Sequence, residues 1–233
     1  MSDNAPKKGE PIFFLDVETL PAEETDPLWV QLSSELKLQK GETPEEFETR
    51  KKKIHYDTAM LSPLGRVWMI GYAERSSEPR ILAGDGSIEA EVKLLRELNG
   101  ILEKIDNPWF VGHNISGFDL PFLQVRALKH KLPFLARKLG RYTTKPWDQR
   151  VLDTQKIWPR TTADRSSWEN GGLRGIARLD TICEVLGVPR QTGVMGPEVY
   201  NAYLARDVQG VKDHLYQDIT QVREVFKLLW PIV

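Results

Sequence analysis

Short apolar runs and longer segments of helical periodicity alternate along the chain. Residues 11–17, 65–73 and 79–84 are typical of strands, and the polar stretch "ERSSE" between the last two predicts a hairpin turn. Three early strands joined in this way predict an antiparallel meander at the start of the fold.

The middle of the chain alternates helix and strand patterns. Residues 87–105 carry apolar side chains at the three- and four-residue spacing of a helix, with Ser87 as a suitable cap. Residues 108–114 are typical of a short buried strand, and 118–132 of another helix. This alternation predicts that later strands are added in parallel to the meander.

The last third of the chain continues the alternation. A strand begins at 151, helices follow near 175–187 and 196–206, and 161–172 has the composition of a loop. The final helix, 207–230, has one apolar face. Together the segments predict an α/β protein with a mixed five-stranded sheet, three strands antiparallel and the others added in parallel, flanked by helices.

A segment rich in Glu and Lys, residues 20–62, separates the first two strands. Its stretch "TPEEFETRKKKIHYDTA" predicts a helix, because Thr43 suits the cap position, Pro44 the first helical position, and acids follow in the first turn. A charge run of this kind favours a solvated helix face.

Composition and charge set further bounds. With 40% apolar and 28% charged residues, the 233-residue chain resembles soluble globular proteins, and we expect a disordered tail at 1–10 and one domain over 11–233. No apolar run approaches the ~18 residues of a membrane span, and the single Cys183 has no partner for an internal disulfide. A cytoplasmic setting without a membrane fits. The net charge of −1 means that binding of nucleic acid needs a local basic patch.

Two carboxylates interrupt the first apolar strand, in "FFLDVETL". Asp16 and Glu18 are two positions apart, so they share one face of the strand, where they repel and raise each other's pKa. A hard divalent cation such as Mg²⁺ would hold such a pair through its oxygen atoms. The alternative is that one carboxylate caps a turn and the other faces solvent.

Further acids follow in two other segments. Asn114 and Asp119 come just after a predicted strand in "VGHNISGFDLPFL", where Asp119 could also be a helix cap. Asp218, in "VKDHLYQDITQV", shares a helix face with Leu215, and His214 lies one turn earlier on that face. A carboxylate that faces the core needs a cation or an Arg as partner.

These three segments, in this order, resemble the DEDD superfamily of 3′–5′ exonucleases. "FLDVETLP", "GHNISGFDLPFL" and "HLYQD" look like its three motifs. The second is similar to the exonuclease domains of family B DNA polymerases, and more so to stand-alone bacterial or phage relatives of that domain. The resemblance extends over about residues 11–230. It implies a ribonuclease H-like fold and two-metal hydrolysis of a phosphodiester.

The resemblance also implies roles for the four acids. Asp16 would bridge two Mg²⁺ or Mn²⁺ ions. Glu18 and Asp218 would hold the ion that activates water, and Asp119 would support the other ion. Two cations would also explain why carboxylates are crowded in an apolar strand, because their charge outweighs the repulsion.

One position departs from the pattern. The family B-like subgroup has a Tyr four residues before the final Asp, where this chain has His214, and the other main subgroup has a His five residues before, where this chain has Asp213. Tyr216 lies about 200° round the helix from Asp218 and faces another way. We expect His214 to orient the attacking water or act as general base, since imidazole titrates near neutral pH. The alternative is an inactive descendant.

Residues 129–150 form a stretch rich in Lys and Arg with interleaved aromatic residues. Such a stretch can pair with phosphates and stack on unpaired bases, although an ordinary basic surface loop would look the same. The resemblance adds two contacts to the 3′-terminal nucleotide. The residues predicted to bind nucleic acid are Asn114, Phe118, Lys138, Arg141, Tyr142, Lys145 and Trp147.

The leading interpretation is a metal-dependent 3′–5′ exonuclease that acts on single-stranded DNA, with a replication or repair partner left open. One rival is a ribonuclease H-like nuclease directed at RNA or branched DNA, because the acids do not discriminate the sugar. Another is a catalytically inactive nucleic-acid-binding module that assists a polymerase or helicase.

Overall fold

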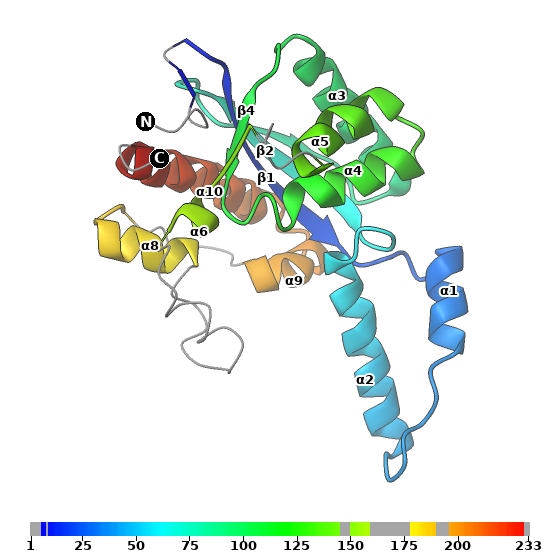
Figure 1. The fold of residues 1–233 in the computed structure, drawn as a ribbon. Helices are drawn as coiled ribbons and strands as arrows, with labels where there is room; N and C mark the ends of the chain where they lie inside the picture. The colour runs from blue at the N-terminus through cyan, green and yellow to red at the C-terminus, as the bar shows by residue number, and fades with distance from the viewer. Residues whose placement is uncertain (1–5, 8, 145–149, 159–177, 190–195, 231–233) are drawn as a thin grey trace.

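A five-stranded mixed sheet lies at the centre of the computed structural model, which describes residues 6–7, 9–144, 150–158, 178–189 and 196–230 (Figure 1). The strand order is β3-β2-β1-β4-β5. β1 pairs antiparallel with β2 and β2 with β3, whereas β4 and β5 add in parallel. The predicted meander with parallel additions is therefore confirmed. The strands are β1 (Ile12–Leu20), β2 (Arg66–Glu74), β3 (Arg80–Ala83), β4 (Trp109–Gly112) and β5 (Val151–Asp153).

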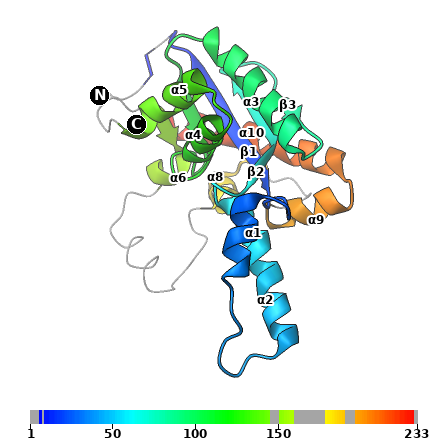
Figure 2. The same ribbon diagram turned by 90° about the vertical axis from the view of Figure 1, so that its right-hand side faces the viewer.

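Helices cover both faces of the sheet (Figures 1 and 2). One face is covered by α3 (Ile88–Glu103), α4 (Asp119–Lys129) and α5 (Pro133–Thr144). The other is covered by α6 (Thr154–Ile157), α8 (Leu179–Leu186), α9 (Val199–Leu204) and α10 (Val208–Leu229), with a short 3₁₀ turn, η3 (Gly196–Glu198), before α9. The stretch considered as a basic loop thus contains a helix, α5. The predicted loop at 161–172 lies outside the described residues.

The alternation of side chains along β1 decides which face receives the carboxylates. Phe13, Leu15 and Val17 pack in the core beneath α3 and α4, and Phe14 packs in the core beneath α10. Asp16 and Glu18 have the same parity as Phe14, so both point toward the α10 face. The predicted shared face of the two acids follows directly from this register.

β1 is longer than its parallel neighbour, and this opens a gap in the sheet. The β1–β4 pairing runs only as far as Phe14 opposite Val111, whereas β1 continues to Leu20. The backbone of β1 beyond Phe14 therefore faces the end of β4 without a strand partner on that side. Divergence of neighbouring strands at their carboxyl ends is a common position for sites in α/β sheets.

The segment between β1 and β2 forms an arm that projects from the body (Figures 1 and 2). It contains α1 (Pro27–Ser34), α2 (Pro44–Asp57) and the 3₁₀ turn η1 (Thr58–Met60). Thr43 caps α2 in a capping box with Glu46, as the sequence predicts. α2 has no buried residue, which agrees with the predicted solvated helix.

The last residues before β1 contact the neighbouring part of the sheet. Glu10, which we expected in a disordered tail, accepts a hydrogen bond of 2.9 Å from the indole of Trp109 and pairs with Arg150 at 3.1 Å. These contacts fasten the residues before β1 to the neighbouring strands. In the part of the chain that the structure describes, none of the helices combines the length and apolar character needed to cross a bilayer.

Candidate active site

Four carboxylates from three elements gather where β1 and β4 diverge. β1 supplies Asp16 and Glu18, the first residue of α4 is Asp119, and α10 supplies Asp218. Burial raises the pKa of Asp16 well above its ordinary range, and the charges of Asp119, Asp218 and Glu18 raise it further. The three sequence segments with candidate acids therefore meet at one place, as predicted for them.

Asp119 is fixed by the unpaired edge of β1. Its Oδ1 accepts a hydrogen bond of 3.0 Å from the backbone N–H of Val17, which has no partner strand there. The side chain is 2% exposed. Burial raises the pKa of Asp119 to about 8; backbone hydrogen bonds oppose this rise, and the charges of Asp153 and Glu18 add to it. Asp119 is thus more than a helix cap, because its carboxylate satisfies the backbone of β1 where the pairing with β4 has ended.

Asp218 and His214 face the strand carboxylates from α10. His214 Nε2 lies 3.3 Å from Glu18 Oε1 and 3.4 Å from Asp218 Oδ2. Burial raises the pKa of Asp218 to about 6, against the favourable charge of His214. Burial lowers the pKa of His214, but the hydrogen bond to Glu18 and the neighbouring negative charges outweigh it and raise the pKa overall. The imidazole therefore bridges two of the four acids.

Tyr216 takes no part in this cluster. It is 40% exposed, and its hydroxyl donates a hydrogen bond of 2.6 Å to Glu78. Helical geometry predicts this direction, because two residues along a helix point to nearly opposite sides. His214, and not Tyr216, is therefore the side chain of α10 that faces Asp218 and Glu18.

The chemistry of the cluster suits divalent metal ions. Carboxylate oxygens are the ligands that Mg²⁺ and Mn²⁺ prefer. Burial, with added repulsion between the acids, raises the pKa values of Asp16, Asp119 and Asp218, and bound cations would oppose this rise. Among the described residues, no group of three or more His, Cys, Asp or Glu side chains is already arranged around a single point. The donor set fits, and ligation requires side-chain adjustment, including release of Glu18 by His214.

Asp153 is a buried acid that the sequence interpretation missed. It ends β5, is 4% exposed, and accepts hydrogen bonds from the backbone N–H groups of Asn114 at 2.9 Å and Ser116 at 3.2 Å. The Ser116 hydroxyl donates a third at 2.5 Å. Asp153 thereby holds the loop that leads from β4 into Asp119. The sequence did contain a sign of this role, because Asp153 in "VLDT" is an acid in an apolar strand segment.

Two predicted contacts to nucleic acid lie in that loop. Asn114 has a left-handed backbone conformation, with φ of 56°, and Phe118 immediately precedes Asp119. The Phe118 ring packs on Phe122 with 5.2 Å between centroids. Both residues are partly exposed and adjoin the acids, so the structure brings them to the site.

Lys138, in the basic stretch 129–150, contacts the end of α3. The Lys138 ammonium donates to the backbone carbonyls of Leu102 and Ile105, the latter at 2.7 Å, where α3 ends. In this structure Lys138 satisfies carbonyls at a helix C-terminus, where a cation is favoured, and its contact with nucleic acid stays a prediction. The side chains of Arg141 and Tyr142 and the whole of Lys145 and Trp147 lie outside the described residues.

Comparison with known proteins shows the family of this chain. Residues 62–227 match the family described as predicted 3′–5′ exonucleases related to the exonuclease domain of PolB, and the chain belongs to this family. It is also 32% identical, over 136 residues, to the DNA polymerase alpha catalytic subunit of Oryza sativa subsp. japonica, covering 57% of this chain and 8% of that protein.

The fold is shared with a solved polymerase. The family B DNA polymerase from the hyperthermophilic archaeon Pyrobaculum calidifontis superposes with a TM-score of 0.55 at 16% identity, over 94% of this chain and 24% of that one. The expected ribonuclease H-like fold is confirmed. The family match begins at residue 62, so it includes Asp119, His214 and Asp218 but not β1. Asp16 and Glu18 precede the matched residues, and β1 brings them to the site.

Proposed function

We propose that this protein hydrolyses phosphodiester bonds from the 3′ end of single-stranded DNA by a two-metal mechanism. The observation that carries the proposal is the meeting of Asp16, Glu18, Asp119 and Asp218 at the open end of β1, where burial raises the pKa values of the three aspartates and neighbouring negative charges add to the rise. Such a concentration of buried negative charge is costly unless cations neutralise it.

The position of each acid indicates which metal ion it would hold. Asp16, at the centre of the cluster, would contact both Mg²⁺ or Mn²⁺ ions, Glu18 and Asp218 one of them, and Asp119 the other. When bound, two such ions activate a water molecule and stabilise the leaving oxygen of an in-line displacement. Asp119 also keeps the site open, because its bond to Val17 N–H satisfies the backbone where the strands part.

His214 has the position to handle a proton beside the cluster. In this structure its Nε2 lies within 3.4 Å of both Glu18 and Asp218. Cations that take these two carboxylates would free the imidazole, and only its neutral form can accept a proton from the attacking water. Asn114 and Phe118, beside Asp119, would contact the terminal nucleotide.

A single-turnover digestion tests the proposal. A 5′-labelled single-stranded DNA is incubated with Mn²⁺, and the proposal predicts a ladder of products shortened one nucleotide at a time from the 3′ end. Asp16→Asn, which keeps the size of the side chain, should leave the strand intact. Internal cuts, or digestion confined to RNA or branched DNA, would favour the ribonuclease H-like alternative.

Binding without any cleavage would favour the inactive module. The family assignment concerns the exonuclease relationship only, and the chain spans small fractions of the polymerases that it matches. A replication or repair partner and a cytoplasmic setting remain predictions. Reconstitution with a polymerase would be the next step once the ladder is seen.

A further inference from the structure

The arm between β1 and β2 begins beside the active site. Thr19, the residue after Glu18, donates its hydroxyl to the carbonyl of Ala59 at 2.8 Å. The Ala22 N–H donates to the Thr58 hydroxyl at 2.9 Å. The C-terminal end of α2 is therefore fastened next to the carboxylates, and the N-terminal end projects away from the body (Figures 1 and 2).

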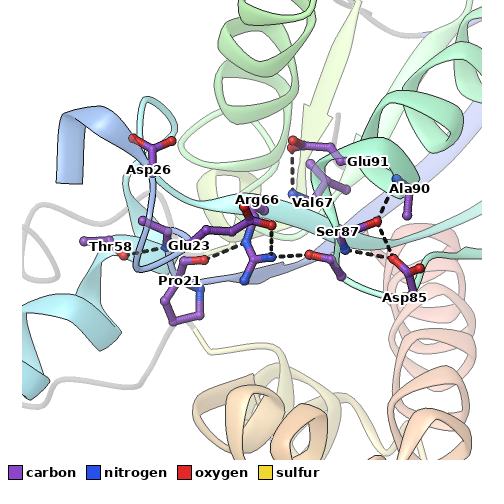
Figure 3. A network of polar contacts seen from close by, with 12 residues as sticks. Pro21, Glu23, Asp26, Thr58, Arg66, Val67, Asp85, Ser87, Ala90 and Glu91 are labelled. Atoms are coloured by element: carbon purple, nitrogen blue, oxygen red, sulfur yellow. Dashed lines mark hydrogen bonds and ion pairs between the residues drawn. The ribbon is translucent and has the colours of Figure 1, made fainter. Parts of the chain in front are cut away.

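A polar network fixes the root of the arm to the sheet. Figure 3 shows Arg66 at its centre, donating to the carbonyl of Pro21 at 2.9 Å and to Glu23 at 3.1 Å. Arg66 also donates to the carbonyl of Gly86. Because Arg66 is only 8% exposed and belongs to β2, the arm leaves the sheet in a defined direction.

α2 has two different faces near this root. One face packs toward α1, where the His55 ring lies 4.9 Å from Trp29 and Ile54 packs on the same cluster. Tyr56 lies on the opposite face and meets Tyr200 of α9, with 5.6 Å between ring centroids. Lys52 and Lys53 precede Tyr56 by four and three residues, so they lie on its face, one turn away.

Lys52 and Lys53 form no ion pair with the residues that the structure describes. Both are exposed, and neither side chain forms a hydrogen bond with another described residue. The neighbouring Arg50, in contrast, forms a bidentate ion pair with Glu42, with N···O distances of 2.7 and 2.9 Å. Glu48 precedes Lys52 by four residues and Asp57 follows Lys53 by four. Residues 51–57, the half of α2 that adjoins the site, nevertheless hold three lysines against one acid, so the positive charge is concentrated there.

Aromatic rings continue the surface from the lysines to the body. Tyr200 stacks on Tyr203 with 6.2 Å between centroids, and Val199 and Ala202 of the same helix pack with Leu20, the last residue of β1. Tyr56 and Tyr200 are both partly exposed. Partly exposed rings beside lysines are the combination by which proteins hold single strands, with bases on the rings and phosphates on the ammonium groups.

We infer that Lys52, Lys53, Tyr56 and Tyr200 form a surface that binds single-stranded DNA upstream of the 3′ end being cleaved. The inference rests on the proposed function and specifies how its substrate is held. An acidic site repels a polyanion, so cationic groups at its border are needed to bring the strand in. The surface lies outside the residues of the family match except for Tyr200, so it is a feature of this chain's arm.

The test compares charge removal at the two ends of the arm. The double variant Lys52→Gln/Lys53→Gln (the root pair) removes two charges where the arm joins the body. The double variant Lys37→Gln/Lys40→Gln (the far-end pair) removes two charges at the exposed far end and is the matched control. Binding of labelled dT20 is measured by anisotropy in Ca²⁺ over a series of salt concentrations. Loss of two phosphate contacts on a single strand should reduce the slope of log K against log salt by about 1.4 for the root pair only.

Substitution of the Tyr56 ring and steady-state kinetics test the same surface independently. Tyr56→Ala should weaken dT20 binding by about five-fold or more, whereas Tyr56→Phe, which keeps the ring, should bind as the wild type does. With Mn²⁺, the root pair should raise KM for dT20 with kcat unchanged.

The failure of this inference is distinguishable from failure of the proposed function. If the wild type digests dT20 and the root pair has the same salt slope as wild type, or as the far-end pair, the arm surface is refuted while the exonuclease stands. If the wild type binds dT20 with the predicted slope change but digests nothing, the exonuclease fails and the binding surface stands. No binding of dT20 at all would overturn both.

Discussion

The buried acids make a prediction about the metal-free protein, namely that its stability falls as pH rises. Asp119 is raised to a pKa of about 8 in the folded chain, mainly by burial, whereas an unfolded Asp titrates near 3.9. A folded-state pKa above the unfolded value means that the native state binds more protons between the two. Its stabilising effect is complete below the unfolded pKa and is lost as pH rises toward 8.

The magnitude for Asp119 follows from one excess proton bound by the folded chain. Asp16, whose pKa is also raised by burial, acts in the same direction. While Asp119 is protonated in the native state only, the free energy of unfolding falls by about 1.4 kcal/mol per pH unit, or by about 2–3 kcal/mol between pH 6 and pH 8. Burial raises the pKa of Asp218 to about 6, so most of the stabilising effect of its protonation is lost below pH 6. The pKa of His214 is also raised, so its contribution has the same sign.

Urea unfolding in EDTA at pH 6, 7 and 8 measures the effect. Asp119→Asn is the control, because the amide oxygen can still accept from Val17 N–H but the group no longer ionises. The wild type should lose stability across this range, and the variant should lose about 1.4 kcal/mol less per pH unit. Stability that rises with pH, or equal pH slopes in the two proteins, would refute the argument that burial of this acid strains the metal-free site.

Three further predictions concern single side chains. His214→Ala should slow single-turnover cleavage in Mn²⁺ by ~10²–10⁴-fold with DNA affinity nearly intact, and His214→Tyr should recover part of the rate; rates within three-fold of wild type would make His214 a bystander. Asp153→Ala should lower kcat more than it raises KM, with Asp153→Asn less affected, because the loop before Asp119 loses its acceptor; an unchanged kcat would exclude this role. Lys138→Met should lower the free energy of unfolding by about 1–2 kcal/mol and leave the salt dependence of DNA binding unchanged, and a smaller salt slope would return Lys138 to the DNA surface.

The sequence predicted the parts of the site that depend on local periodicity. The two-residue alternation of β1 places Asp16 and Glu18 on one face, and the helical repeat of α10 places His214 beside Asp218. These relations need no knowledge of the rest of the chain. The pairing of His214 with Glu18 was beyond the sequence, because it depends on how α10 crosses β1.

Contacts between residues that are distant in the sequence were the ones that the sequence did not predict. Lys138 reads as a phosphate ligand in a basic stretch, but its ammonium meets the end of α3, more than thirty residues earlier in the chain. Asp153 reads as an unremarked strand end, although it holds the loop before Asp119. Long side chains and strand-end acids take their function from the tertiary partners that they find, and periodicity carries no information on those partners.

The most direct test of the central claim is to count bound metal ions. Titration with Mn²⁺ at pH 8, followed by electron paramagnetic resonance of the free ion, should give up to two ions bound to the wild type in the presence of single-stranded DNA. Asp16→Asn, which removes the carboxylate shared by both ions, should bind markedly fewer under the same conditions. Equal binding by the two proteins, or none by the wild type, would contradict the account of these four acids as a metal site.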